Sequence, residues 1–306
     1  MKGERVVLAG GSGFLGTLLA RELIRRGADV TILSRDPAVE SDGIKRVTWD
    51  GRTCGRWAEQ VEGALAVVNL AGRSVNCRPT VANRRAIIDS RVNSVKILGE
   101  AIRRCTKPPR AFVQAAAQGI YGDIGEDACE ESSPPGKGFL VETCRLWEAA
   151  FNESLTPSTR RVLVRIGFVL GVEGGALPPL AALTRWGLGG TVGSGKQWVS
   201  WIHSQDIARI FAAAIEREDF DGLYNASAPK PVTNAVFMRE LRRALGRPWS
   251  PPAPAWAIRL GAWLMGTDGR LALTGRRCLP TRLLNAGFEF SFPQLAPALA
   301  DLTRNS

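Results

Sequence analysis

A glycine-rich stretch near the start of the chain reads Ala9-Gly10-Gly11-Ser12-Gly13-Phe14-Leu15-Gly16. The apolar run Arg5–Ala9 before it predicts a short buried strand, and Phe14–Arg26 after it carries leucines and an isoleucine at helical spacing. Three glycines spaced G-x-x-G-x-x-G therefore lie between a strand and a helix. In this context the pattern favours a loop that holds the pyrophosphate of a dinucleotide.

The three glycines meet different steric needs in such a loop. Gly10 permits the tight turn from strand to helix, Gly13 lets the pyrophosphate approach the backbone, and Gly16 lets the helix pack closely on the strand. Phe14 and Leu15 begin the helix, whose free N–H groups and positive dipole end favour phosphate. We therefore expect all five residues to contact a cofactor.

The end of the second expected strand distinguishes between cofactors, and it reads Thr31-Ile32-Leu33-Ser34-Arg35-Asp36. An acidic residue at this position accepts hydrogen bonds from the ribose hydroxyls of NAD. Here the hydroxyl of Ser34 and the guanidinium of Arg35 can instead hold the 2′-phosphate of NADP. The residues favour NADP, while Asp36 leaves NAD open if the strand ends one residue later.

Strand-like and helix-like segments alternate through the first half of the chain. Apolar runs at 29–33, 64–70 and 111–116 alternate with helical periodicity at 82–104 and 139–152. The runs are apolar throughout, as expected for strands that are covered on both faces. The pattern predicts an α/β fold with a Rossmann-like, doubly wound parallel sheet.

The amino-acid composition changes after Gly171, where glycine and proline become frequent. We expect residues 1–170 to form the NADP-binding Rossmann domain and residues 171–306 to form a smaller C-terminal substrate lobe. The segment 200–220 reads as a strand running into a helix, so it is expected to return to the first domain. The apolar stretch Ala255–Met265 is too short to span a bilayer and is expected to be a packing helix.

Composition and charge exclude several classes of protein. With 45% hydrophobic and 23% charged residues and no long apolar run, the chain reads as a globular protein without a membrane-spanning helix. The net charge is +11, but the basic doublets are scattered, which argues against a nucleic-acid partner. The six cysteines form no C-x-x-C pair and His203 is the one histidine, so no metal site is expected. With no secretion signal, we expect a cytoplasmic protein.

Further short motifs follow the glycine loop, among them Trp49-Asp50, Asn69-Leu70-Ala71-Gly72, Asp89-Ser90-Arg91 and Arg165–Gly171. With them the chain resembles an extended short-chain dehydrogenase/reductase. More narrowly, it is similar to the branch of NADP-binding sugar-nucleotide epimerases whose substrates are unknown. The resemblance implies cofactor contacts at Asp50, Leu70, Ala71, Gly72, Arg91 and Val169. Asp50 would lie near the adenine, Val169 near the nicotinamide, and Arg91 on the opposite side of the cofactor.

The catalytic pair of that class is missing. Its enzymes use Tyr-x-x-x-Lys, in which the lysine lowers the pKa of the tyrosine that transfers the proton. At the start of the expected helix this chain offers Phe139 with Thr143, or Leu140 with Cys144. The serine of the preceding strand is also absent, since residues 114–117 read Gln-Ala-Ala-Ala. Tyr121 and Glu142 are the candidate catalytic substitutes, and Cys144 and His203 are weaker ones.

Two functions remain open from the sequence. The first is a reductase or nucleoside-diphosphate-sugar epimerase that acts with NADP(H) on a small carbonyl or sugar substrate. The alternative is a non-catalytic NADPH-binding sensor or regulatory protein. The expected partner is a small-molecule substrate, and a homodimer is compatible with the sequence. Gly190–Lys196 resembles a phosphate-binding P-loop, but Gln197 stands where the magnesium-binding hydroxyl is required.

Overall fold

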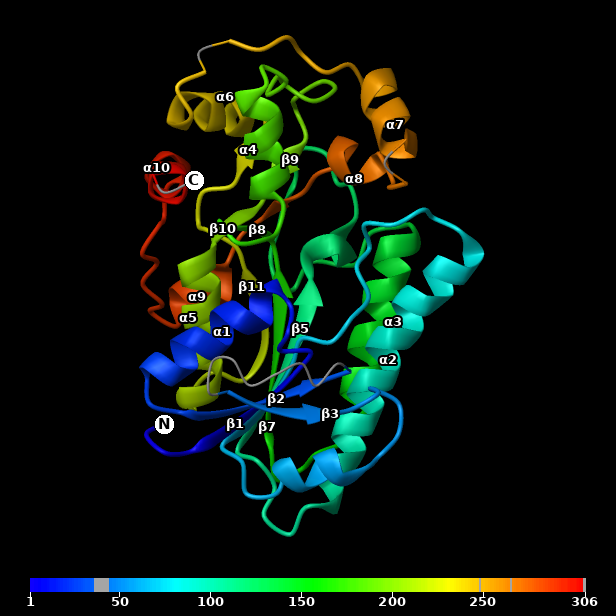
Figure 1. Ribbon diagram of the computed structural model, residues 1–306, viewed down its shortest axis with the longest axis vertical. Coiled ribbons are helices and arrows are strands. Elements are labelled where there is room, and N and C mark those ends of the chain that lie inside the picture. The colour runs from blue at the N-terminus through cyan, green and yellow to red at the C-terminus, as the bar shows by residue number, and fades with distance from the viewer. Residues whose placement is uncertain (36–43, 248, 265, 305–306) are drawn as a thin grey trace.

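The computed structural model describes residues 1–35, 44–247, 249–264 and 266–304. Within these ranges, seven strands form one sheet in the order β11-β7-β5-β4-β1-β2-β3 (Figure 1). Each ladder in this sheet is parallel. The strands are β1 (Arg5–Ala9), β2 (Asp29–Ser34), β3 (Lys45–Thr48), β4 (Ala66–Asn69), β5 (Ala111–Ala117), β7 (Arg160–Ile166) and β11 (Gly222–Ala226). The strand order turns back between β1 and β4, which confirms the Rossmann-like, doubly wound fold.

Helices cover both faces of the sheet (Figure 1). On one face α1 (Phe14–Arg25) packs against α5 (Ser204–Glu216), and on the other α2 (Val81–Arg104) packs against α3 (Phe139–Glu153). Because both faces are covered, the side chains of β4 are buried throughout, as are those of β1 after Arg5. The continuous apolar runs in the sequence have this origin.

A second, smaller hydrophobic core lies beyond the sheet. Its buried residues include Leu177, Trp201, Phe237 and Leu299. The helices that carry it are α4 (Leu177–Arg185), α6 (Asn234–Ala244) and α10 (Leu295–Thr303). Two short ladders add to this part of the fold: β8 (Phe168–Leu170) with β10 (Trp201–His203), and β9 (Trp198–Val199) with β12 (Val232–Thr233).

Other short elements complete the fold. They are β6 (Ala128–Cys129), which pairs with β13 (Arg277–Cys278), α8 (Arg270–Leu273), α9 (Thr281–Asn285) and the 3-10 helices Arg56–Gln60 and Gln118–Tyr121. The pairing of β6 with β13 brings the C-terminal part of the chain against the segment that follows β5. Side chains from the middle of the chain and from its C-terminal part therefore meet near the edge of the sheet.

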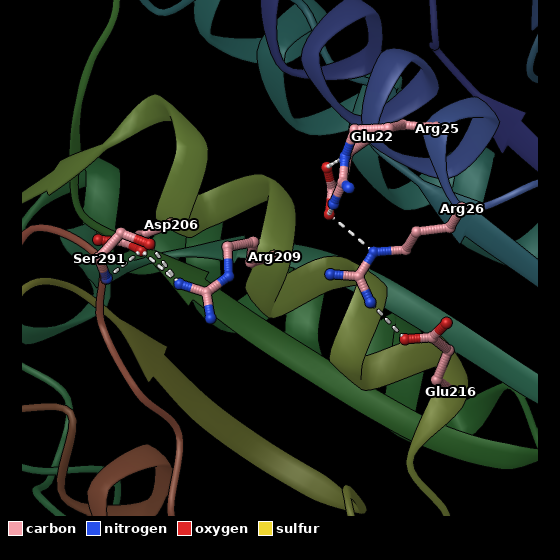
Figure 2. Close-up of polar contacts among 7 residues, drawn as sticks. All are labelled: Glu22, Arg25, Arg26, Asp206, Arg209, Glu216 and Ser291. Atoms are coloured by element: carbon pink, nitrogen blue, oxygen red, sulfur yellow. Dashed lines mark hydrogen bonds and ion pairs between the residues drawn. The ribbon is translucent and has the colours of Figure 1, made fainter.

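The chain returns to the sheet after residue 200. Helix α5 covers one face and β11 adds an edge strand, so the returning segment extends to Ala226 rather than ending near residue 220. Figure 2 shows Arg26 of α1 between Glu22 and Glu216, at 2.7 and 2.6 Å. The buried carboxylate of Asp206 accepts hydrogen bonds from the backbone N–H groups of Ser291 and Phe292, at 2.8 and 2.9 Å. These contacts attach α1 and the C-terminal segment to α5.

Helix α7 (Ala255–Leu264) departs from the expected packing helix. Of its described side chains Ala262 alone is buried, while Trp256 and Trp263 are exposed. The expectation was wrong because the apolar residues of this segment are not gathered on a face that meets the second core. No helix in the described ranges is both long and apolar enough to cross a bilayer.

Candidate functional site

The glycine loop forms a cradle at the N-terminus of α1. Gly10 has a φ of +75°, and a Cβ there would lie 2.7 Å from the Cα of Ala71. A Cβ on Gly16 would lie 2.4 Å from the Cα of Gly11, so glycine is required at both positions. A Cβ on Gly13 would meet no atom nearer than 3.8 Å, which leaves open space in front of the helix.

The helix that begins at this loop has free donors. Gly13 precedes α1 without a side-chain cap, and the first turn carries no acidic residue. Its N–H groups and positive dipole end therefore face the open space above Gly13. This is the arrangement in which helices bind phosphate, so the residues present fit a dinucleotide pyrophosphate.

Phe14 contacts the loop that follows β8. A Cβ on Gly171, Gly174 or Gly175 would lie 2.4, 2.7 and 3.1 Å, respectively, from an atom of its ring. The glycines at 171–175 therefore admit the ring and let this loop fold over the start of α1. Leu15 and Val169 are half-buried against the main core on the same side. The loop after β8 thus forms one wall of the cradle.

Ser34 and Arg35 lie at the carboxyl end of β2, next to the glycine loop. The Oγ of Ser34 is 3.3 Å from the Oγ of Ser12, and Arg35 is exposed to solvent. The guanidinium of Arg35 is therefore exposed close to the cradle, and the bonded hydroxyl of Ser34 lies beside it. Asp36, which left NAD open, lies outside the described residues.

The Asp50 carboxylate is engaged by its own turn. It accepts hydrogen bonds from the N–H groups of Arg52 and Thr53 and from the Thr53 hydroxyl, at 2.8, 2.9 and 2.7 Å. These bonds favour the charged form and lower the pKa of Asp50 to about 2. Asp50 shapes the loop after β3, and its oxygens are already bonded there.

Backbone groups of Leu70, Ala71 and Gly72 follow β4 at the same edge of the sheet. The buried Asn69 fixes them, since its Oδ1 accepts a hydrogen bond from the Ala71 N–H at 3.1 Å. Gly72 leaves room for Arg91, because a Cβ on it would lie 3.2 Å from the guanidinium carbon.

Arg91 approaches the loop from α2. Its Nη1 donates to the carbonyls of Arg73 and Ile87 at 2.9 and 3.0 Å, and its guanidinium stacks 5.0 Å from the Trp147 ring centroid. Burial lowers the pKa of Arg91. In the described ranges no carboxylate pairs with it.

A cavity of about 520 Å³ lies between the sheet and the second core. It opens where β5 and β7 end, so it shares the carboxyl edge of the sheet with the glycine cradle. Its walls include Arg91, Gln118, Leu140, Cys144, Phe168 and Arg276. A larger hollow, of about 1210 Å³, lies near Glu4, Arg110 and Thr159, at the amino ends of the strands. Open α/β sheets bind ligands at the carboxyl ends, so the smaller cavity is the candidate substrate site.

Neither candidate catalytic residue reaches this cavity. Tyr121 is 1% exposed; its hydroxyl accepts a hydrogen bond from Nη1 of Arg165 and donates one to Oδ1 of Asn225. Burial raises the pKa of Tyr121 far above its usual value. The Glu142 side chain is 57% exposed and lies 3.8 Å from Arg145. The geometry therefore does not support the catalytic role that the sequence suggested for either residue.

The sequence left two registers for the missing pair, and in one of them it falls on Leu140 and Cys144. Both line the cavity, four residues apart on α3. In the other register Phe139 does not line the cavity, and Thr143 bonds its hydroxyl back to the Phe139 carbonyl at 2.9 Å. Cys144 is buried, and burial raises the pKa of its thiol to about 12. In this register the α3 side chains that face the cavity are a leucine and a neutral thiol.

His203 is a helix cap. Its Nδ1 accepts a hydrogen bond from the Gln205 N–H at 3.1 Å, and its ring stacks on Phe292 with 3.8 Å between centroids. The residue lies outside the cavity. In the described part of the chain, no group of three or more His, Cys, Asp or Glu side chains could hold a metal ion.

Sequence reasoning did not find two polar residues of the cavity, Gln118 and Arg276. Gln118 directly follows β5, and neither polar atom of its buried amide has a partner. Arg276 belongs to a basic doublet that the charge pattern assigned to the surface. Gln118 could have been recognised from the sequence, because it stands at the end of a buried strand. Arg276 could not, because it reaches the cavity only through the pairing of β6 with β13.

Comparisons with known proteins agree with this architecture. The model of the NAD dependent epimerase/dehydratase family matches residues 6–141, and a domain of unknown function, DUF1731, matches residues 253–302. The chain is 37% identical to the epimerase family protein SDR39U1 of Bos taurus over 304 residues, which cover 97% of this chain and 99% of that protein. It is 34% identical to the epimerase family protein YfhF of Bacillus subtilis over 300 residues, with 97% of each chain covered.

A solved structure is similar over nearly the whole length. The crystal structure of human SDR39U1 isoform 2 with NADPH has a TM-score of 0.88 and 34% identity, covering 99% of this chain and 100% of that one. The resemblance to extended short-chain dehydrogenases/reductases is thereby confirmed. The chain belongs to the SDR39U1 epimerase family.

Proposed function

We propose that the protein binds NADP(H) at the carboxyl edge of its sheet and reduces a small carbonyl substrate in the adjoining cavity. The observation that carries the proposal is the open space above Gly13, directly in front of the uncapped N-terminus of α1. This space and the cavity lie at the same edge of the sheet. The NADPH bound to the human relative supports the choice of cofactor. When bound, NADPH supplies the hydride.

Each part of the cofactor has residues to hold it in this proposal. The loop residues Gly10, Gly13, Phe14, Leu15 and Gly16 receive the pyrophosphate, and Ser34 and Arg35 receive the 2′-phosphate. Leu70, Ala71 and Gly72 pass beside the ribose, with Arg91 behind them, Asp50 shaping the adenine end and Val169 near the nicotinamide. These assignments rest on placement at one sheet edge and on the family pattern.

Reduction is favoured over sugar epimerisation by the chemistry of the α3 residues. Oxidation of a sugar hydroxyl, the first step of an epimerisation, needs a group that removes a proton. Leu140 has no such group, and the raised pKa of Cys144 keeps its thiol protonated at neutral pH. In a reduction the hydride adds to the carbonyl carbon and the oxygen takes its proton from a water molecule, so no residue of α3 has to accept a proton.

A second candidate is an NADPH sensor without turnover. The chemistry of the α3 residues also favours this function, because neither Leu140 nor Cys144 can carry out the usual proton transfer. Such a transfer contributes roughly 10²–10⁴-fold to the rate. In this function the cavity would hold a regulatory ligand. The two candidates share the cofactor site and differ in whether the hydride leaves NADPH.

Isotope transfer distinguishes them. NADPH deuterated at the transferable position is incubated with the protein and a panel of small aldehydes and ketones, and products are analysed by mass spectrometry. Deuterium in a product at a rate above that of a protein-free control supports the reductase. If NADPH binds but the label stays on the cofactor with each substrate, the reductase is abandoned in favour of the sensor.

A further inference from the structure

The cavity between the sheet and the second core is lined by positively charged side chains, and none of its described lining residues is negatively charged. Arg91 and Arg276 line it, and no aspartate or glutamate of the described residues does. Arg91 stands behind Gly72, and two backbone carbonyls accept hydrogen bonds from its Nη1. Arg276 approaches from the opposite side, next to β13. The electrostatics of the cavity therefore favour an anionic occupant.

The guanidinium of Arg276 is free to bind a ligand. In the described structure its side chain has no hydrogen-bond or ion-pair partner. It lies on the same side of Gly119 as Cys144: a Cβ on this glycine would lie 3.5 Å from Nη1 of Arg276 and 3.6 Å from Sγ of Cys144. The guanidinium and the thiol therefore share this part of the cavity wall.

Gln118 gives independent evidence for a ligand. Its side chain is 2% exposed, it lines the cavity, and neither Oε1 nor Nε2 has a partner. A buried amide left without partners costs free energy, and native structures rarely tolerate it. Oε1 lies 2.9 Å from where a Cβ would stand on Gly167, so the absence of that Cβ makes room for the amide.

Most other polar groups of the cavity are already bonded within the protein. The Ser200 hydroxyl donates to the Arg276 carbonyl and accepts from the Cys278 N–H, both at 2.8 Å. Oδ1 of Asn234 accepts from the Val192 N–H, and Nε2 of Gln197 donates to backbone carbonyls. A sugar with several hydroxyls would find few partners here. Among the described residues of the cavity wall, the groups without a partner include the buried Gln118 amide, the Arg276 guanidinium and the buried indole N–H of Trp147.

We propose that the carbonyl substrate of this site also carries a carboxylate on a compact apolar body, and that the carboxylate is bound through Arg276 and Gln118. This inference rests on the proposed function and adds the substrate class. Arg276 forms charge-assisted hydrogen bonds to the carboxylate, and the Gln118 amide donates to one of its oxygens. The apolar body lies against Phe168, Phe237 and Leu140. A nucleoside diphosphate fits less well, because its sugar and ribose hydroxyls would meet polar groups that are already bonded within the protein.

The test compares a carboxylate with its neutral isostere. Isothermal titration calorimetry measures the binding of trans-cinnamate and trans-cinnamamide, with and without saturating NADPH. We expect cinnamate to bind at least about tenfold more tightly, because hydrogen bonds to charged groups are the stronger ones. Arg276→Gln should abolish this preference, Arg276→Lys should restore part of it, and Gln118→Leu should weaken cinnamate several-fold.

Arg239→Gln is the matched control, since Arg239 is a surface arginine of α6 that pairs with Glu240. It makes the same change in net charge and should leave both affinities unchanged. Equal affinity for the two probes, absence of cinnamate binding at any soluble concentration, or a preference that survives Arg276→Gln overturns the inference. NADPH titrated into the same samples reports separately on the proposed function, which fails if the wild-type protein does not bind it.

Discussion

The hydroxyl of Tyr121 accepts a hydrogen bond from Nη1 of Arg165 at 2.8 Å and donates one to Oδ1 of Asn225 at 2.9 Å. Arg165 also binds both carboxylate oxygens of Glu148, each at 2.8 Å. The phenol therefore connects the turn after β5 to β7, β11 and α3. This network explains why Tyr121, one of two tyrosines in the chain, is buried instead of facing the substrate cavity.

Tyr121→Phe should lower stability while leaving cofactor binding intact. The change leaves Asn225 Oδ1 and one Arg165 N–H without their partner in a buried site, which costs about 1–3 kcal/mol. Urea unfolding followed by circular dichroism measures the loss, and NADPH fluorescence measures binding. Unchanged stability together with lost turnover would instead return Tyr121 to a catalytic role.

Glu142→Gln should have almost no effect. The carboxylate is exposed, and its distance of 3.8 Å from Arg145 is that of a weak surface pair. We expect a change in unfolding free energy within about 0.5 kcal/mol and no change in hydride transfer to any substrate found active. A large drop in the transfer rate at unchanged stability would show that Glu142 moves to the cavity in the working enzyme.

Arg35→Ala should weaken NADPH binding and spare NADH. The guanidinium is exposed at the end of β2, where it can reach a 2′-phosphate that NADH lacks. Losing a charge-assisted hydrogen bond costs about 1.5–3 kcal/mol, so the Kd for NADPH should rise roughly ten- to a hundredfold. Fluorescence titrations of both nucleotides give the comparison. Equal weakening of the two would contradict the assignment of the 2′-phosphate.

The cofactor cradle could be predicted from sequence because its requirements are local. Gly10 adopts a positive φ, and Gly16 lies in close contact with Gly11. Both requirements arise within one strand–turn–helix segment, so the local sequence reveals them. The alternation of apolar runs likewise predicted the central strands β1, β2, β4 and β5. The strand β11 was missed because its five residues include Asn225, a polar residue buried for the sake of contacts with Tyr121 and Leu279.

The substrate cavity could not be predicted, because distant segments build it. Gln118 and Arg276 face the same space only once β13 pairs with β6, and no pattern of period 2 or 3.6 records that pairing. The missing catalytic pair was visible in the sequence, but its substitutes were sought by proximity along the chain. The Tyr121 side chain turned out to be occupied by an arginine 44 residues away.

His203 should make stability depend on pH. Nδ1 accepts the Gln205 N–H and must stay unprotonated, and burial lowers the pKa of His203 below 6.5, against smaller opposing effects of Asp301 and Asp206. The unfolded chain therefore takes up this proton first as the pH falls. The stability contributed by neutral His203 is complete above about pH 6.5 and is lost as the pH falls from there toward the folded pKa.

His203→Asn tests this dependence, since asparagine can still cap α5 but does not titrate in this range. Urea unfolding at about pH 7.5 and about pH 5.5 should show a larger loss of stability for the wild type than for the variant. Because His203 is the one histidine, its imidazole NMR signal gives the folded pKa directly. Parallel pH profiles for the two proteins, or an imidazole that titrates above pH 6.5, would contradict the cap as the cause. Carboxylates far from His203 contribute equally to the two curves, whereas Asp301, 3.3 Å from Nε2 of His203, loses its partner in the variant, so its imidazole contact belongs to the same test.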